Sequence, residues 1–254
     1  MLNTFLFYKI YEKLFMNNFL NIIINNYKNG NIKFSNDKLI VFDIGAYKGT
    51  FSKDLNEKFR YKKKGIHFYL FDPLKKFINF EKRQFNDINY FDLAFDSSKP
   101  STKNFYLNNF LHASGSSLKG NSFKDKKYIV SRTLIASLIN PFKKMVKIIK
   151  VKTNNIDNFC KKNKIKYINI LKIDTEGTEL DVLLGSKKMI RNTDVICIEI
   201  QCSKNRFNSR LKKIEKLLNK KFQLFYKKRI LIASILTGIV SYDYIYVRKK
   251  SLKT

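Results

Sequence analysis

The densest group of side chains able to do chemistry lies between residues 172 and 185, in the run Lys-Ile-Asp-Thr-Glu-Gly-Thr-Glu-Leu-Asp-Val-Leu-Leu-Gly. Lys172, Asp174, Glu176 and Glu179 stand where an apolar segment gives way to a helical pattern. Packing alone does not explain so many charges, because buried charges are costly unless they are paired. A Lys172–carboxylate pair, with acidic residues favoured near a helix N-terminus, is one explanation. A catalytic site is the other, and both predict that Asp174 points into the crevice at the strand end.

A second group begins at Asp43, in the run Asp-Ile-Gly-Ala-Tyr-Lys-Gly. The spacing of Gly45 and Gly49 lets the backbone turn sharply and bring amide donors against a ligand, close to a helix N-terminus. A turn that needs glycine for a positive φ would account for the same residues. The run is not the G-x-G-x-x-G of a dinucleotide site, because Tyr47 occupies the middle glycine position. On its own, the turn does not identify a ligand.

Asp72 indicates which ligand the glycine turn could bind. It lies one residue beyond the second predicted strand. An acidic residue at that distance after a glycine turn is placed to accept hydrogen bonds from both hydroxyls of a ribose. The alternative is a helix N-cap ahead of Pro73, since Asp is a favoured capping residue. The two roles are compatible, and ribose contact is the preferred interpretation.

Short apolar strands alternate with helices from residue 39 onward. The predicted strands cover residues 39–44, 66–71, 89–95, 167–173, 195–200, 222–234 and 241–247. The predicted helices cover residues 49–60, a segment opened by Pro73, 179–191 and 207–218. This alternation predicts an α/β fold with a mostly parallel sheet covered on both faces. Ligands of such sheets bind at the carboxyl ends of the strands, which is where the charged groups fall.

One domain accounts for residues 36–254, and residues 1–35 are predicted to form an N-terminal helical extension. Residues 96–150 separate two strands by far more than an ordinary crossover, and they include a predicted extra strand at 104–107. Insertions of this length in a compact domain are usually lids or binding loops. We therefore expect the substrate pocket on that insertion.

These residues carry a resemblance to the FkbM family of methyltransferases over about residues 35–248. The matching blocks are Val41–Thr50, Phe71–Pro73, Ala94, Ser116–Leu118, Asn155–Asp157, Lys172–Gly185, Glu199 and Tyr242–Ile245. Tyr47 stands where Asn is common in the family, and Asp72 where Glu is common. The resemblance implies a Rossmann-like class I methyltransferase fold, with a mostly parallel seven-stranded sheet, helices on both faces and an antiparallel last strand. It also implies S-adenosylmethionine as the cofactor.

The resemblance implies a role for each matching residue. The methionine portion of the cofactor would contact Asp43, Gly45, Ala46, Tyr47 and Gly49. Asp72 would bind the ribose, while Asp92, Leu93 and Ala94 would line the adenine. Asp174 and Glu176 would face the methyl group and the acceptor, with Glu199 near them. Glu179, Ser116 and Ser117 are further candidates on the substrate side.

Methyl transfer to a sugar-type hydroxyl needs a base within hydrogen-bond reach, because such a hydroxyl has a high pKa. We expect Asp174 to be that base, with Lys172 orienting it. His112 is the alternative base, since it is one of two histidines and lies in the predicted insertion. His67 falls inside a strand and is expected to be structural. The expected activity is O-methylation of a saccharide or related small molecule.

The formal charge of +31 supports a second interpretation. A field of that sign attracts phosphates, acidic glycans and anionic lipid surfaces, so a nucleic-acid substrate or peripheral contact with an anionic surface stays open. However, the charge comes mostly from Lys, whereas base recognition usually relies on the bidentate fork of Arg. AT-rich coding would also inflate Lys, Asn, Ile, Phe and Tyr. A basic binding module without catalysis is a third interpretation, which the concentrated acidic residues argue against.

The cysteines and the apolar segments bear on where the protein works. Cys160, Cys197 and Cys202 show no CxxC spacing, which indicates a reducing compartment and no structural metal. The first residues lack the basic region and the uninterrupted apolar stretch of a signal peptide. The longest apolar run, residues 230–240, is far shorter than a membrane span. We therefore expect a cytoplasmic protein without a transmembrane segment, and the sequence leaves the oligomeric state open.

Overall fold

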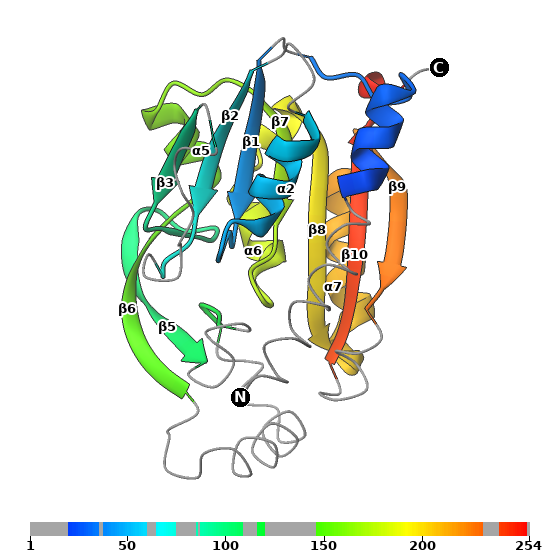
Figure 1. Ribbon diagram of the computed structural model, residues 1–254. Helices are drawn as coiled ribbons and strands as arrows, with labels where there is room; N and C mark the ends of the chain where they lie inside the picture. The colour runs from blue at the N-terminus through cyan, green and yellow to red at the C-terminus, as the bar shows by residue number, and fades with distance from the viewer. Residues whose placement is uncertain are drawn as a thin grey trace, which may run out of the picture.

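The computed structural model describes residues 20–35, 38–59, 65–74, 85, 87–108, 116–119, 146–230 and 239–252. The main sheet has seven strands in the order β3-β2-β1-β7-β8-β10-β9 (Figure 1). Their bounds are β1 Leu39–Ile44, β2 Ile66–Phe71, β3 Ile88–Phe91, β7 Ile168–Ile173, β8 Thr193–Ser203, β9 Phe222–Arg229 and β10 Ile239–Arg248.

The strands β3, β2, β1, β7 and β8 run parallel to one another. The last strand of the chain, β10, lies antiparallel between β8 and β9. The predicted Rossmann-like α/β fold, with a mostly parallel seven-stranded sheet and an antiparallel last strand, is confirmed. The strand order reverses between β1 and β7, and ligands of open α/β sheets bind at such a reversal.

Helices cover both faces of the main sheet (Figure 1). One face carries α2 (Thr50–Phe59) and the helical residues 20–28, whose apolar side chains share a core with β1, β2, β8 and β10. The other face carries α5 (Ile156–Lys162), α6 (Glu179–Leu184) and α7 (Lys204–Leu218). All six residues of β7 are buried, as expected for a parallel strand covered on both sides. Each large apolar side chain buried this way stabilises the fold by about 1.5–3 kcal/mol.

A second sheet of three strands, in the order β4-β6-β5, extends from the carboxyl end of the main sheet (Figure 1). Its strands are β4 (Ala94–Phe95), β5 (Ser101–Asn108) and β6 (Val146–Asn154), and β5 and β6 form a long antiparallel ribbon. The extra strand predicted at 104–107 is confirmed as part of β5. The predicted strand 89–95 divides into β3 and β4, which belong to different sheets. Neither β6 nor α5 was predicted.

Other boundaries differ in instructive ways from those predicted. The predicted helix 179–191 ends at Leu184, and a short 3-10 helix, η3 (Met189–Asn192), follows. The predicted strand 195–200 extends to Thr193–Ser203. Most of the helix predicted after Pro73, and the end of the strand predicted at 222–234, lie outside the described residues.

Residues 20–28 are helical and pack into the same core as the main sheet. The boundary drawn near residue 35 stays a prediction. No helix in the described residues is long and apolar enough to cross a membrane.

Candidate active site

The carboxyl ends of β1, β2 and β7 meet closely enough for their main chains to hydrogen-bond. The amides of Gly45 and Ala46 donate to the Phe71 carbonyl oxygen at 2.9 and 3.1 Å, and the Asp174 amide donates to the Ile44 carbonyl oxygen at 3.0 Å. Gly45 has φ 75, and a Cβ atom there would lie 1.8 Å from the Asp174 carbonyl oxygen. Only glycine fits this crossing. Residues widely separated in the sequence are therefore brought to one edge of the sheet.

The glycine turn uses its amides inside the protein. Gly45 and Ala46 donate to Phe71, the Tyr47 amide donates to Asp72 Oδ2 at 2.9 Å, and the Gly49 amide donates to the Ala46 carbonyl oxygen at 2.7 Å. The expectation that the turn brings amide donors against a ligand stays a prediction, and the amides of Gly45, Ala46, Tyr47 and Gly49 are used within the protein. The glycine at position 45 serves the close approach of the β1 and β7 ends.

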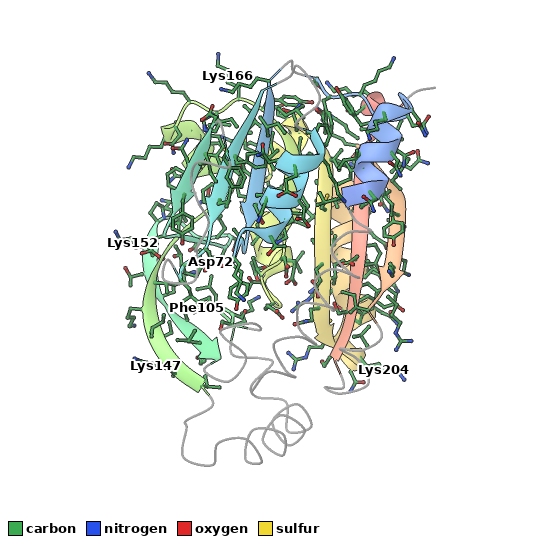
Figure 2. The ribbon with its side chains drawn as sticks, viewed as in Figure 1. Asp72, Phe105, Lys147, Lys152, Lys166 and Lys204 are labelled. Atoms are coloured by element: carbon green, nitrogen blue, oxygen red, sulfur yellow. The ribbon has the colours of Figure 1, made fainter. Side chains whose placement is uncertain are left out.

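Asp72 lies at the carboxyl end of β2, between the main sheet and the β5–β6 ribbon (Figure 2). Its Oδ1 accepts the Leu74 amide at 2.8 Å, while Oδ2 accepts the Tyr47 amide. The residue is only 7% exposed, and burial raises the pKa of its carboxyl to about 6 despite the lowering effect of both amides. Each carboxylate oxygen keeps a second acceptor site. The bond to Leu74 resembles a helix cap, so the capping role is compatible with a ligand contact.

Tyr90 supports Asp72 from β3. The Tyr90 hydroxyl donates to the Asp72 carbonyl oxygen at 2.5 Å. Burial raises the pKa of Tyr90 well above its usual value, and the negative charge of Asp72 adds to the effect. The hydroxyl therefore stays a donor, which fixes the main chain that carries the carboxylate. Sequence reasoning did not identify this contact.

Lys172 is the centre of the charged group. Its Nζ lies 3.1 Å from Asp43 Oδ1 and 3.4 Å from Asp174 Oδ2, and it donates to the Gly45 carbonyl oxygen at 3.2 Å. Ser52 of α2 donates to the other Asp43 oxygen at 2.7 Å. Burial alone would lower the pKa of Lys172, but Asp43 and Asp174 outweigh burial and raise it. The predicted pairing of Lys172 with a carboxylate is confirmed, and it involves two carboxylates.

Glu179 is buried and shapes the loop after β7. Its Oε1 accepts the Gly177 amide at 2.6 Å, and its Oε2 pairs with Arg210 Nη1 of α7 at 3.3 Å. Glu176 and Gly177 both have positive φ, at 55 and 106, so the loop turns tightly around this carboxyl. Burial raises the pKa of Glu179 to about 7, with Arg210 and the amide acting in the opposite direction. Its contacts are those of a residue that holds the loop carrying Thr175 and Glu176.

Glu199 and Asp243 add a second acidic pair beside Asp174. They are directly opposite partners in the antiparallel β8–β10 register, and the Ser241 hydroxyl donates to Glu199 Oε1 at 2.7 Å. Burial raises the pKa of both carboxyls, and the charge of Asp174 raises both further. Glu199 was singled out from the sequence. Asp243 was seen only as part of a matching block, and its place opposite Glu199 needs the strand register.

The segment Ser116–Lys119 reaches the same region from the side of the ribbon. Ser117 exchanges main-chain hydrogen bonds with Tyr106 of β5, and its hydroxyl donates to the Thr175 carbonyl oxygen at 3.3 Å. Lys119 forms an ion pair with Asp181 of α6. The predicted candidates Ser116 and Ser117 therefore lie next to the loop after β7.

Apolar residues of the ribbon face the glycine turn. Phe105, Leu107 and Val151 form a cluster with Leu74 and Ala94, against which Tyr47, Leu118 and Ile149 pack. In Figure 2, Phe105 lies below Asp72, on the side where the ribbon projects. The ribbon thus forms an apolar wall beside the charged strand ends.

The remaining candidates are placed less centrally. Asp92 is exposed, Leu93 is half-buried against the core, and Ala94 is buried in β4. His67 pairs with Asp87 at 3.1 Å near the amino end of β2. His112 lies outside the described residues. Within the described part of the chain, no three His, Cys, Asp or Glu side chains are arranged to hold a metal ion.

Comparison with known proteins gives one family match. The model of the family described as the methyltransferase FkbM domain matches residues 43–225. No curated protein matches the chain.

Three solved structures are similar to the chain. A methyltransferase FkbM from Methylobacillus flagellatus KT is 12% identical with a TM-score of 0.43, and the similarity covers 82% of this chain and 44% of that one. A proposed RNA methyltransferase from Pyrococcus horikoshii is 13% identical with a TM-score of 0.38, over 90% and 81% of the two chains. M. jannaschii TYW2 in complex with AdoMet is 13% identical with a TM-score of 0.38, over 89% and 75%. The chain spans less than half the length of the first of these.

Proposed function

Because the chain belongs to the FkbM methyltransferase family, we propose that it transfers a methyl group from S-adenosylmethionine to a hydroxyl of a saccharide or a related small molecule. The observation that carries the proposal is the meeting of Gly45, Asp72 and Asp174 at the reversal of strand order. That place is where an open α/β sheet binds a nucleoside-containing ligand.

The side chains at this edge suit such a cofactor. Asp72 is a buried carboxylate with acceptor sites left for the ribose hydroxyls. Lys172 pairs with two carboxylates, Asp43 and Asp174, so this cluster carries a net negative charge, which favours a cation. When bound, the cofactor supplies an activated methyl group on a positively charged sulfur. Asp92, Leu93 and Ala94 are proposed to line the adenine, as the family resemblance implies.

Asp174 is proposed as the group that receives the acceptor's proton. The cofactor would supply the methyl group, so the residues of this chain would have to align the acceptor hydroxyl and take up its proton. The hydroxyl proton then moves to the Asp174 carboxylate, which Lys172 holds at 3.4 Å. Pairing with Lys172 orients Asp174 and keeps a buried ammonium compensated. Glu176, on the same loop, is proposed to face the acceptor.

Calorimetric titration with S-adenosylmethionine tests the cofactor assignment. We expect Asp72→Asn to weaken binding by about 10- to 100-fold, because one charge-assisted hydrogen bond is worth ~1.5–3 kcal/mol. Asp87→Asn is the matched control, since Asp87 pairs with Lys38 and His67 near the amino end of the sheet. Unchanged affinity in Asp72→Asn, or no binding by the unmodified protein, would refute the assignment.

The pH dependence of binding gives an independent check. The ribose hydroxyls need the carboxylate form of Asp72, whose pKa in the folded protein is about 6. Affinity is therefore expected to be full above that value and to fall as the pH drops through it. The dependence should disappear in Asp72→Asn. The free energy of unfolding of the ligand-free protein should depend on pH in the opposite sense. Because the pKa of Asp72 is raised from 3.8 to about 6 in the folded protein, its contribution to stability is largest at low pH and is lost as the pH rises through about 6.

The acceptor is identified by a turnover assay against fractionated cell-envelope saccharides and small metabolites, with the product read by mass. A nucleic-acid acceptor is the second candidate, favoured by the formal charge of +31. RNA binding that persists at physiological salt, together with methylated RNA as product, would support it. Binding that vanishes as salt rises reflects counterion release alone.

A further inference from the structure

We propose that Glu199 and Asp243 act together as the proton store of the site, holding a proton between them and receiving the acceptor's proton by way of Asp174. This inference rests on the proposed function, because it gives that reaction a place for the proton it releases. Neither residue is proposed to touch the acceptor. Both act through Asp174 and are positioning residues.

The strand register makes Glu199 and Asp243 direct cross-strand neighbours on one face of the sheet. Glu199 and Asp243 are directly opposite in the antiparallel β8–β10 pair, where the Cβ atoms of such partners lie about 4.5–5.5 Å apart. Both side chains point to the sheet face that carries α2, the face on which Lys172 contacts Asp43. Two carboxylates this close repel each other, and a shared proton removes the repulsion. Like charges directly opposite in a sheet would otherwise destabilise it.

The surroundings of the pair favour retention of a proton. Asp174 and Glu176 of the β7 end add negative charge near Glu199, while Ser241 donates a hydrogen bond to it. Asp243 has Asp174 on one side, with Lys172 and Lys228 as the positive groups within electrostatic range. Removal from water outweighs these cations, so the pKa of each carboxyl is raised. Burial raises the pKa of Asp243 to about 7, so the pair can exchange a proton through this member near neutral pH.

Cofactor binding would prepare the store for use. A sulfonium beside Asp174 adds a positive charge to a group of carboxyls and lowers their pKa values. The pair then releases its proton to water, which leaves a carboxylate free when the acceptor arrives. During methyl transfer the acceptor's proton moves to Asp174 and from there to the emptied pair. The proton finally leaves to solvent, because both side chains are only partly buried.

The test measures protons and needs no acceptor. Heats of binding of S-adenosylmethionine and of the neutral S-adenosylhomocysteine are measured at neutral pH in buffers of different ionisation enthalpy. We expect proton release on binding the sulfonium and clearly less on binding the neutral thioether. Asp243→Asn and Glu199→Gln should each remove most of that difference, and each should weaken binding of the sulfonium more than binding of the thioether, because the deprotonated pair favours the cation. Glu57→Gln, an exposed carboxylate on α2, is the control and should change nothing.

A second readout uses the unmodified protein with ¹³C-labelled carboxyls. The titration is expected to show two coupled carboxyls that keep a proton well above the usual Asp and Glu range, and Glu199→Gln should shift the remaining one downward. Equal proton release with both ligands, or release unchanged in both variants, would overturn the inference while the cofactor assignment stands. No binding of S-adenosylmethionine at all would defeat the proposed function first. Melting temperatures show whether each variant is folded. If one variant is not folded, the ¹³C titration of the unmodified protein tests the inference.

Discussion

At the scale of single residues, Gly45 combines a positive φ with a very close approach of another strand end. Its φ of 75 disfavours any side chain, and a Cβ atom would lie 1.8 Å from the Asp174 carbonyl oxygen. Gly30 has the same φ but nothing within 4 Å of a built Cβ atom. The two glycines therefore separate backbone strain from steric overlap.

Alanine at each position measures the two effects. Gly30→Ala is expected to cost about 1–2 kcal/mol of unfolding free energy, the strain of a left-handed backbone. Gly45→Ala adds overlap with the β7 end and should cost about 2–5 kcal/mol in total, together with loss of cofactor binding. Urea unfolding and calorimetry give both numbers. Equal losses of unfolding free energy in the two variants would mean that the carboxyl end of β7 can move to make room for the added methyl group.

The sequence placed most of the candidate side chains at the strand ends that the structure brings together, because the carboxyl ends of parallel strands are where an α/β sheet binds its ligands. Asp43, Asp72, Lys172 and Asp174 were all found this way, and Lys172 pairs as expected. The partners that come from distant strands were not found. Asp243 and Arg210 reach the site through the β8–β10 register and the packing of α7, which no local pattern reports.

At the scale of elements, Gly185 fixes how α6 meets the second sheet. A Cβ atom there would lie 2.2 Å from the Asp96 carbonyl oxygen and 2.9 Å from Asn155 Cβ. Asn155 caps α5 by accepting the Asn158 amide, and Asp157 accepts the Lys188 and Met189 amides at the start of η3. The Asn-Ile-Asp block therefore locks α5, α6 and β4 together behind the site.

Gly185→Ala is expected to cost about 1–3 kcal/mol through overlap, because the nearest atom is the main-chain carbonyl oxygen of Asp96, which cannot move aside as a flexible side chain can. Gly65→Ala is the matched control, since its nearest contact is the Lys38 Cγ at 3.9 Å. That variant should stay within about 0.5 kcal/mol of the unmodified protein. Chemical denaturation measures both, and a neutral Gly185→Ala would show that α6 can slide.

Strands and helices were predicted correctly where the hydrophobic residues followed a clear pattern. They were missed where charged residues interrupted that pattern. The central parallel strands β1, β2 and β7 are near-continuous apolar runs, and their existence was correctly predicted. β6 was missed because lysines interrupt it. In β6, the buried Val151 and Thr153 alternate with the exposed Lys150 and Lys152, which is the pattern of a half-buried strand. The division of residues 89–95 between two sheets could not be predicted, since it depends on tertiary packing.

At the scale of the whole molecule, the two ends of the main sheet carry different groups of polar side chains. The carboxyl end carries the charged site, while a hydrogen-bond network around the buried Asp194 occupies the amino end. Asp194 accepts from the Ser35 amide, Asn169 Nδ2 and the Tyr167 and Ser251 hydroxyls. One carboxylate thus joins segments from both extremes of the described chain to β7 and β8.

Asp194→Ala is expected to cost about 2–5 kcal/mol, because several buried donors lose their acceptor together. Affinity for S-adenosylmethionine in the folded variant should stay within about twofold, since the site lies at the other end of the strands. Asp87→Ala, which removes a partly exposed ion pair with Lys38, should cost at most about 1 kcal/mol. Thermal unfolding measures the stability, and calorimetry the affinity, of the unmodified protein and of both variants. A large affinity loss in Asp194→Ala would show that the two ends are coupled.

The Asp194 network has a practical consequence. The residues that join the amino ends of the strands and those proposed to bind the cofactor lie at opposite poles of the same strands, so each group can be substituted while the other keeps its own residues. Anchoring the protein to a support through residues near Ser35 or Ser251 would leave the reactive pole turned toward the solution.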